Sequence, residues 1–195
     1  VVTDSVGCKD TAYKTLQVLG YEGAFSYSPI EGCAPLTVNF VSHVKGNVPT
    51  MIWDFGDGNT MPGSYLQPNV SYTYKNPGKY IPHMVFNNNQ GCSVGSDGTD
   101  TIIVDGVIPD FDHGPACQYS TVQFFDKSTS VASPVTTLDW TFHDGSTSNL
   151  ADPELPFTTP GKYPVKLRLT NARGCADSIL KDIEIHVPIE MSVGN

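Results

Sequence analysis

The sequence predicts an all-β protein built from two tandem copies of a β-sandwich domain. Three observations lead to this prediction. Short apolar alternations are interrupted about every eight to twelve residues by clusters of turn-forming residues, as in β-sandwiches. The chain of 195 residues holds 18 glycines and 15 prolines, which suits many strands joined by turns. No stretch of ten or more residues carries the apolar stripe of a helix.

The two copies are visible as four segments that recur 83 to 87 residues further along the chain. The first pair is Cys33 with Thr37–Phe40 and Cys117 with Thr121–Phe124, and the second is Trp53–Gly58 and Trp140–Gly145. The third pair is Pro77–Tyr80 and Pro160–Tyr163, and the fourth is Gly91-Cys92 and Gly174-Cys175. We therefore expect complete domains at residues 20–106 and 107–188. Gly7-Cys8 also matches Gly174-Cys175, so residues 1–19 are expected to be the last strands of a truncated preceding domain, including a strand at Lys14–Val18. Residues 189–195 are expected to begin a following domain.

Within each copy, the alternation predicts which residues face the core. One strand carries a valine and a phenylalanine on one face, and the next carries a tryptophan and a phenylalanine: Val38 and Phe40, Val122 and Phe124, Trp53 and Phe55, Trp140 and Phe142. The tryptophans are therefore expected to be core residues rather than sugar-stacking ones. Asp57-Gly58 is expected to supply the positive φ angles of a tight hairpin. Later strands are expected at Tyr80–Phe86 and Tyr163–Leu169.

The Trp53–Gly58 run, the Gly-Lys-Tyr strand start and the later Gly-Cys together resemble the PKD domain (polycystic kidney disease repeat). This resemblance covers nearly the whole chain and implies tandem immunoglobulin-like β-sandwiches. The second copy has Thr141 and His143 where the first has Asp54 and Gly56, which argues against a ligand role at those positions. The cysteine pattern is similar to that of PKD arrays in large Bacteroidota surface proteins, including gliding-motility adhesins exported by type IX secretion.

Two disulfide arrangements are open for the five cysteines. Cys33 precedes the second strand of its domain, and Cys92 follows the sixth. Because these two strands run in the same direction in an immunoglobulin-like sandwich, the two cysteines should lie at opposite ends, roughly 20 Å apart. A disulfide tolerates a Cα separation of at most about 7 Å. Head-to-tail domains would instead bring Cys33 to Cys175 and stiffen the junction. Cys8 and Cys92 would then pair with preceding domains and Cys117 with a following one, so the partner of Cys8 would lie outside this chain. The alternatives are Cys33 with Cys92 and Cys117 with Cys175, or free thiols.

Charge and apolar patterning disfavour two classes of partner. Twenty acidic and eleven basic residues give a formal net charge of −9 and a pI of about 4.7. Nucleic acids and anionic membrane surfaces favour basic proteins, so no nucleic-acid partner is expected. No apolar run approaches the ~20 residues that span a bilayer, so no membrane insertion is expected. The cysteines indicate disulfides in an oxidising compartment. The resemblance adds an extracellular, cell-surface location.

The sequence offers no catalytic constellation. It lacks a Gly-x-Ser-x-Gly elbow, a His-Glu-x-x-His motif and a phosphate-binding glycine loop, and its five histidines are scattered. We therefore predict that the protein is not an enzyme and needs no cofactor. Asp54 and Asp57 are weak candidates for calcium, because Ca²⁺ takes six to eight oxygen ligands and only these two are identified. Roles in a strand and a turn are favoured for them.

One surface pattern recurs at four places. Ser5, Thr11, Thr101 and Ser178 each stand between an aspartate and an aliphatic or alanine residue. This matches the sequence that Bacteroidota O-glycosylate on exported proteins, although simple alternation at a strand start explains it equally well. Tyr21, Tyr27, Tyr65 and Tyr119 are candidates for exposure, but they form no regular strip.

These patterns favour a non-enzymatic spacer in a long extracellular protein, in which neighbouring domains of the same chain are the partners. The resemblance implies, more specifically, the repetitive stalk of a cell-surface adhesin. A surface polysaccharide or protein is a further candidate partner. The alternative is an accessory carbohydrate- or protein-binding module of a secreted hydrolase.

Overall fold

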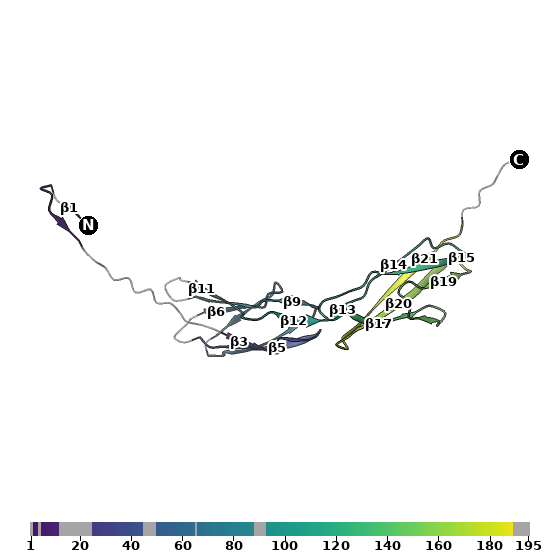
Figure 1. Cartoon of the computed structure of the whole chain (residues 1–195), viewed down its shortest axis with the longest axis horizontal. Coiled ribbons are helices and arrows are strands. Elements are labelled where there is room, and N and C mark those ends of the chain that lie inside the picture. The colour runs from purple at the N-terminus through teal and green to yellow at the C-terminus, as the bar shows by residue number, and fades with distance from the viewer. Residues whose placement is uncertain are drawn as a thin grey trace.

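The structure is a computed structural model and describes residues 2–3, 5–11, 25–44, 50–64, 66–87 and 93–188. It contains two β-sandwich domains that lie end to end (Figure 1). The described residues form strands, turns and bends, which confirms the all-β prediction. The expected strand at Lys14–Val18 and the expected start of a domain at residues 189–195 lie outside the described residues. None of the described residues forms a helix with the length and apolarity that a membrane span needs.

The described residues of the first domain form ten strands in three sheets. They are β3 (Phe25–Ser28), β4 (Glu31–Cys33), β5 (Leu36–Ser42), β6 (Thr50–Asp54), β7 (Thr60–Gly63), β8 (Asn69–Tyr74), β9 (Gly78–Tyr80), β10 (His83–Asn87), β11 (Ser93–Asp97) and β12 (Ile102–Asp105). The strand orders are β3-β5-β8, β11-β10-β6-β7 and β4-β12-β9. β12 pairs with β4 in parallel, and the other pairs are antiparallel.

The second domain repeats this plan. Its strands are β13 (Val107–Ile108), β14 (Phe111–His113), β15 (Ser120–Asp126), β16 (Thr129–Ser130), β17 (Val135–Thr141), β18 (Thr147–Ser148), β19 (Glu154–Phe157), β20 (Gly161–Asn171) and β21 (Ala176–Ile185). The difference is that β20 and β21 each take the place of two shorter strands of the first domain. The orders are β14-β15-β19 and β18-β17-β20-β21, and β13 pairs with β16. Near the N-terminus, β1 (Val2–Thr3) and β2 (Lys9–Asp10) form a short antiparallel pair.

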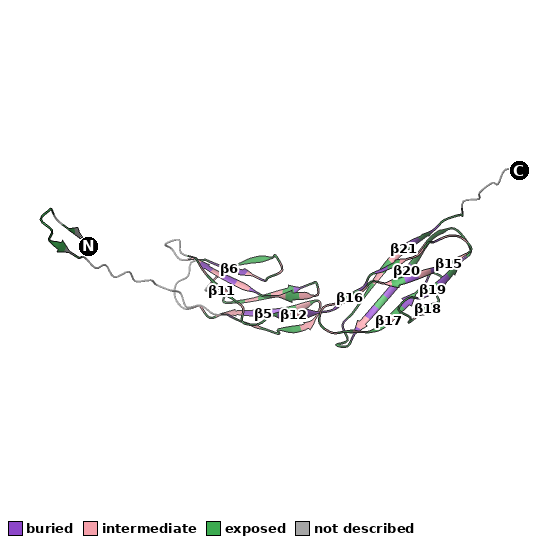
Figure 2. Ribbon diagram, turned by 45° about the horizontal axis from the view of Figure 1, so that its top comes forward, coloured by how far each residue is buried: buried purple, intermediate pink, exposed green. Residues whose placement is uncertain are grey.

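Each domain has its own core between its sheets (Figure 2). Both tryptophans are fully buried, and so are the four strand residues expected beside them: Val38, Phe40, Val122 and Phe124. Phe55 and Phe142 are buried as well. The inward positions alternate with exposed ones along β5 and β15. These findings confirm the expected core residues.

The hairpin after β6 differs in detail from the prediction. Positive φ angles occur at Gly56 (78°) and Gly58 (89°), whereas Asp57 is not among the residues with positive φ. A Cβ at Gly56 would lie 2.4 Å from the carbonyl oxygen of Ile81, so this position admits only glycine. In the second domain His143 takes this place and packs its ring against Phe157 and Tyr163 instead.

The expected single strand at Tyr80–Phe86 is broken in the structure. β9 ends at Tyr80 and β10 begins at His83, which leaves Ile81 and Pro82 between the two strands. The partner strand is interrupted opposite this break, where the amide of Gly98 donates to the carbonyl of Pro82 at 2.8 Å. The matching strand of the second domain, β20, runs without interruption from Gly161 to Asn171.

Candidate functional site at the domain junction

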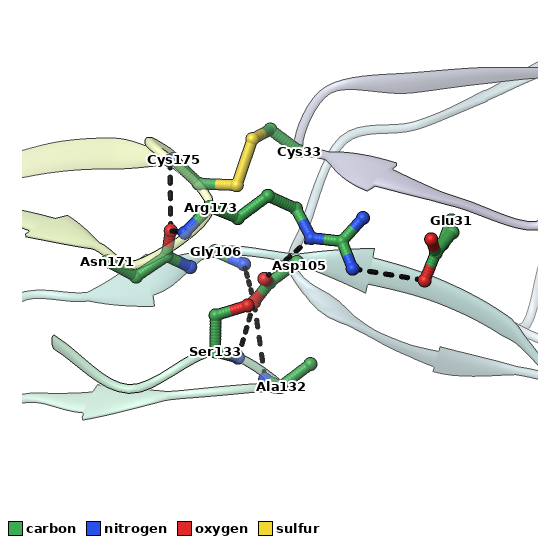
Figure 3. Close-up of polar contacts among 9 residues, drawn as sticks. All are labelled: Glu31, Cys33, Asp105, Gly106, Ala132, Ser133, Asn171, Arg173 and Cys175. Atoms are coloured by element: carbon green, nitrogen blue, oxygen red, sulfur yellow. Dashed lines mark hydrogen bonds and ion pairs between the residues drawn. A yellow bond between two sulfur atoms is a disulfide. The ribbon is translucent and has the colours of Figure 1, made fainter.

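A disulfide joins the two domains. Cys33, at the end of β4, is bonded to Cys175, in the turn between β20 and β21, with a Cα–Cα distance of 5.4 Å (Figure 3). The two residues are 142 positions apart in the sequence. This is the pairing that a head-to-tail arrangement predicts.

The alternative pairs within each domain are not formed. Cys33 and Cys175 are bonded to each other, which excludes Cys33 with Cys92 and Cys117 with Cys175. The physical reason is strand direction, because β4 leads into β5 at the junction end of the first domain. Cys92 lies outside the described residues. Cys8 is exposed, and Cys117 forms no disulfide with any cysteine in the described ranges.

The turn that presents Cys175 is held by a buried asparagine at the end of β20. The side-chain oxygen of Asn171 accepts hydrogen bonds from the amides of Arg173, at 3.1 Å, and Cys175, at 2.9 Å. The Asn171 amide in turn donates to the Cys175 carbonyl at 2.9 Å. Gly174 completes the turn with a φ of 88°. Cys175 is therefore fixed by its own turn as well as by the disulfide.

Asp105 is a fully buried carboxylate at the end of β12. One oxygen, Oδ1, accepts from the amide of Gly106 at 2.8 Å and from those of Ala132 and Ser133 at 3.2 Å each. Burial alone would raise the pKa of Asp105, but the hydrogen bonds from Ser133, Gly106 and Ala132 outweigh it and leave this pKa below its ordinary value. A side chain of the first domain thus caps a loop of the second domain.

Arg173 reaches from the second domain to two acids of the first. Its Nη2 lies 3.0 Å from Oε2 of Glu31, and its Nε lies 3.4 Å from Oδ2 of Asp105. The hydrogen bond and charge of Glu31 raise the pKa of Arg173. Exposed ion pairs contribute about 0–1 kcal/mol, so the contact with Glu31 is weak. The contact with Asp105 is an ion pair without a hydrogen bond, so Oδ2 of this buried carboxylate has no hydrogen-bond partner among the described residues.

The linker between the domains is a single residue. β12 ends at Asp105 and β13 begins at Val107, which leaves Gly106 between them. A Cβ at Gly106 would lie 2.6 Å from Cγ of Pro77, so a side chain here would push the linker away from the first domain. The Gly106 carbonyl accepts from the Val131 amide at 3.1 Å. The linker is therefore short and bound on both sides.

Sequence reasoning missed the polar residues of this junction: Glu31, Asp105, Asn171 and Arg173. The available signal was a difference between the two copies. Asp105 is the residue before the linker in the first domain, and the structure places His186 at the same position of the second.

The two calcium candidates stabilise turns. Oδ1 of Asp54 accepts from the Gly56 amide at 2.9 Å, and Oδ1 of Asp57 accepts from the Asn59 amide at 3.0 Å. Oδ2 of Asp57 accepts from the Tyr72 hydroxyl at 2.6 Å. Among the described residues, no group of three or more histidine, cysteine, aspartate or glutamate side chains is placed to hold a metal ion.

A pocket of about 470 Å³ lies beside this turn in the first domain. Asp57, Lys75, Tyr72 and Tyr80 are among the residues that line it. The Tyr72 ring stacks on Phe55, with 3.8 Å between the ring centres. Burial, followed by the hydrogen bond to Asp57, raises the pKa of Tyr72 to about 12. In the second domain Leu155 takes the place of Tyr72, since both pair with the valine at the centre of the neighbouring strand.

The four hydroxyl residues of the recurring surface pattern are all exposed: Ser5, Thr11, Thr101 and Ser178. Of the tyrosines considered for exposure, Tyr119 is 79% exposed and Tyr27 is partly buried. Tyr21 and Tyr65 lie outside the described residues.

Comparison with known proteins identifies the domain type. The PKD domain family matches residues 27–104 and 108–187. Among solved structures, the PKD1 domain of Vibrio anguillarum Epp is similar at 22% identity, covering 43% of this chain and 96% of its own, with a TM-score of 0.40. The PKD1 domain of the Vibrio cholerae metalloprotease PrtV matches at 24% identity, covering 41% and 96%, with a TM-score of 0.38.

A carbohydrate-binding module of the β-sandwich superfamily matches at 15% identity, covering 87% of this chain and 85% of its own, with a TM-score of 0.40. No curated protein matches the sequence. The family match covers both sandwiches, and the chain therefore belongs to the PKD domain family.

Proposed function

We propose that this chain is a non-enzymatic extracellular segment of a long repetitive stalk in a cell-surface adhesin, and that its role is to hold successive domains at a fixed angle. The observation that carries the proposal is the disulfide between Cys33 and Cys175, which crosses the junction beside a one-residue linker. PKD-type domains are typically non-catalytic modules, which is consistent with a spacer role.

Three restraints act on the same joint. The disulfide limits how far Cys33 and Cys175 separate, the Arg173 contacts cross the interface nearby, and the bound Gly106 linker leaves little length for bending. Two flexibly linked domains would need none of these, since relative motion is the default for domains with small interfaces. A persistent disulfide also requires an oxidising compartment, which supports an extracellular location.

The assignment to a gliding-motility adhesin of Bacteroidota, exported by type IX secretion, rests on the sequence resemblance. O-glycosylation at Ser5, Thr11, Thr101 and Ser178 belongs to the same proposal and is supported by the exposure of all four residues. Intact mass of the natively secreted protein tests it, because a mass equal to that of the bare polypeptide rules the modification out.

Small-angle X-ray scattering of the full chain tests the rigid junction. The oxidised chain is expected to give a distance distribution with a fixed separation between the two domains. Reduction, or the double substitution Cys33→Ser with Cys175→Ser, is expected to broaden that separation, because only the linker and the polar contacts then restrain the joint.

The matched control is Cys117→Ser, which removes a cysteine that lies away from the joint and is expected to leave the scattering unchanged. Reductant should have no further effect on the double variant. A freely bending pair in the oxidised wild-type chain would contradict the rigid-stalk proposal.

A second candidate function, an accessory binding module of a secreted hydrolase, is favoured by the pocket beside Tyr72 and Tyr80. Aromatic rings next to polar groups suit carbohydrate, and the second domain has Leu155 in place of Tyr72. Calorimetric titration with chitin and β-glucan oligosaccharides tests this function. Heat that is lost in Tyr72→Ala would support it, and no heat with the wild-type chain would count against it.

A further inference from the structure

The C-terminal end of the second domain repeats the surface that the first domain uses at the junction. In the first domain the Ala34 amide donates to the Asp105 carbonyl at 2.9 Å, and in the second the Gln118 amide donates to the His186 carbonyl at 2.8 Å. Cys33 pairs in parallel with Asp105, and Cys117 forms a parallel bridge with His186. Cys117 therefore occupies the position of Cys33, and His186 that of Asp105.

We propose that this surface, defined by Pro115, Cys117, Tyr119, His186 and Val187, docks a further PKD-type domain, and that Cys117 forms a disulfide with a cysteine in that domain's β20–β21-type turn. The proposal rests on the proposed stalk function and names the partner of its next joint. The supporting observation beyond the cysteine itself is the first junction, where the equivalent cysteine is bonded to such a turn.

The side chains around Cys117 are suited to a contact. Cys117 is partly exposed and forms no disulfide with the cysteines of the described residues. Tyr119 is 79% exposed and Val187 63% exposed. A contact that covers these two side chains would be favourable, because it removes their apolar surface from water.

Tyr119 is placed to meet the incoming turn. It follows Gln118 as Pro35 follows Ala34, and Pro35 lines the pocket at the first junction together with Cys175 and Asp177. Tyr119 also has a φ of 61°, and it is the non-glycine residue with positive φ within the described ranges. Such a conformation is uncommon outside glycine, asparagine and aspartate, which indicates that the surrounding structure holds this exposed residue in place.

The surface around Cys117 also differs in charge from the corresponding surface of the first domain. At the first junction Arg173 contacts Glu31 and Asp105, whereas the equivalent positions of the second domain carry Pro115 and His186. Neither of these offers a carboxylate to an arginine. A docking turn like that of this domain therefore gains no ion pair from an arginine at the position of Arg173, and we expect an acidic residue there, opposite His186, to strengthen the contact.

The covalent step is an ordinary thiol oxidation. The Cys117 thiol and the incoming thiol lose two protons and two electrons as the S–S bond forms. The electrons pass to the disulfide of a thiol–disulfide oxidant, such as oxidised glutathione, which is reduced to two thiols.

The test recreates this joint after residue Val187, where the added domain replaces residues 188–195. A second copy of residues 107–188, with its own Cys117→Ser substitution, is fused after Val187, so that the linker register of the first junction is kept. The protein is refolded with reduced and oxidised glutathione and mapped by non-reducing peptide mass spectrometry. The expected result is two bridges, Cys33 with Cys175 and Cys117 with the Cys175 of the added copy.

The matched variant carries Arg173→Glu in the added copy, which places an acid opposite His186. The bridged fraction of Cys117 is expected to rise about two- to fivefold, the range for one partly exposed ion pair, because the substitution replaces an arginine that lacks a carboxylate partner at this surface. An unchanged or lower fraction would overturn the stated charge preference.

The docking proposal is overturned if Cys117 is recovered as an alkylated thiol, or bonded to Cys8 or Cys92, in molecules that do contain the bridge between Cys33 and Cys175. That internal bridge shows that the sample has folded. Scattering of the original chain is independent of this result, so failure here and failure of the stalk proposal are distinguishable.

Discussion

The two core tryptophans occupy matching, fully buried positions on β6 and β17, yet their indole N–H groups have different surroundings. Nε1 of Trp140 donates to the Leu150 carbonyl at 2.9 Å. Nε1 of Trp53 is buried without a hydrogen-bond partner among the described residues. The difference shows that the repeated sequence reproduces the packing of the core, whereas hydrogen bonding depends on loops that the two copies do not share.

The largest expected effect tests the equivalence of the two cores. Trp53→Ala and Trp140→Ala are each expected to lower the free energy of unfolding of their own domain by about 3–5 kcal/mol, because each leaves a large cavity. The chain contains two tryptophans, so in each variant the remaining one reports the other domain by fluorescence. Urea unfolding followed by fluorescence and by far-UV circular dichroism separates the two transitions.

The matched substitutions to phenylalanine sharpen this comparison. Trp140→Phe is expected to cost about 1 kcal/mol more than Trp53→Phe, because only Trp140 loses a hydrogen bond. Equal costs for the two phenylalanine variants would mean that the bond to Leu150 contributes nothing.

The next effect compares Asp105 with its counterpart His186. Asp105→Ala leaves the amides of Gly106, Ala132 and Ser133 without their acceptor and is expected to lower the unfolding free energy by about 1–3 kcal/mol. His186→Ala, on an exposed side chain, is expected to change it by less than about 0.5 kcal/mol. Thermal unfolding at pH 7 measures both.

Lowering the pH provides an independent test of the contribution of Asp105 to stability. Its pKa is lowered in the folded protein, so its contribution is fully present above its ordinary pKa of 3.8 and is lost as the pH falls through the lower folded value. The stability difference between wild type and Asp105→Ala should therefore shrink on acidification. A difference that stays constant down to pH 2 would contradict the assignment.

The smallest expected effect depends on Tyr72, whose place in the second domain is taken by Leu155. The pKa of Tyr72 is raised from 10.0 to about 12, so the unfolded chain loses this proton first as the pH rises. The stability of the first domain is expected to fall between pH 10 and 12, and less steeply in Tyr72→Phe. Urea unfolding at pH 9 and 11 measures this. Burial also raises the pKa of Tyr74 and Tyr80, so part of the slope remains in the variant. An identical slope in wild type and Tyr72→Phe would show that the ionisation of Tyr72 does not contribute to this pH dependence.

The core could be predicted from the sequence because two independent signals coincide there. Strand alternation places Val38 and Phe40 on one face, and the second copy repeats them as Val122 and Phe124. Strand direction likewise favoured Cys33 with Cys175, since it is a property of the fold as a whole.

The polar contacts of the junction could not be predicted from these sequence patterns. Arg173 and Asp105 are far apart in the sequence, and their contact depends on the relative orientation of two domains, which local periodicity does not encode. The break between β9 and β10 was also missed, because an alternating pattern continues across Pro82 even though the ladder does not.

The disulfide also determines which parts of the chain carry a pulling force. A pull on the two ends passes along β3 and β4 to Cys33, crosses the S–S bond to Cys175, and leaves through β21. The strands from β5 to β20, the linker and both tryptophans lie inside the covalent loop and outside this path. At about 3.4 Å per residue, the 142-residue separation holds back about 480 Å of extensible chain. Reduction of one bond would release that length, so the redox state of the surroundings sets how far the molecule extends under load.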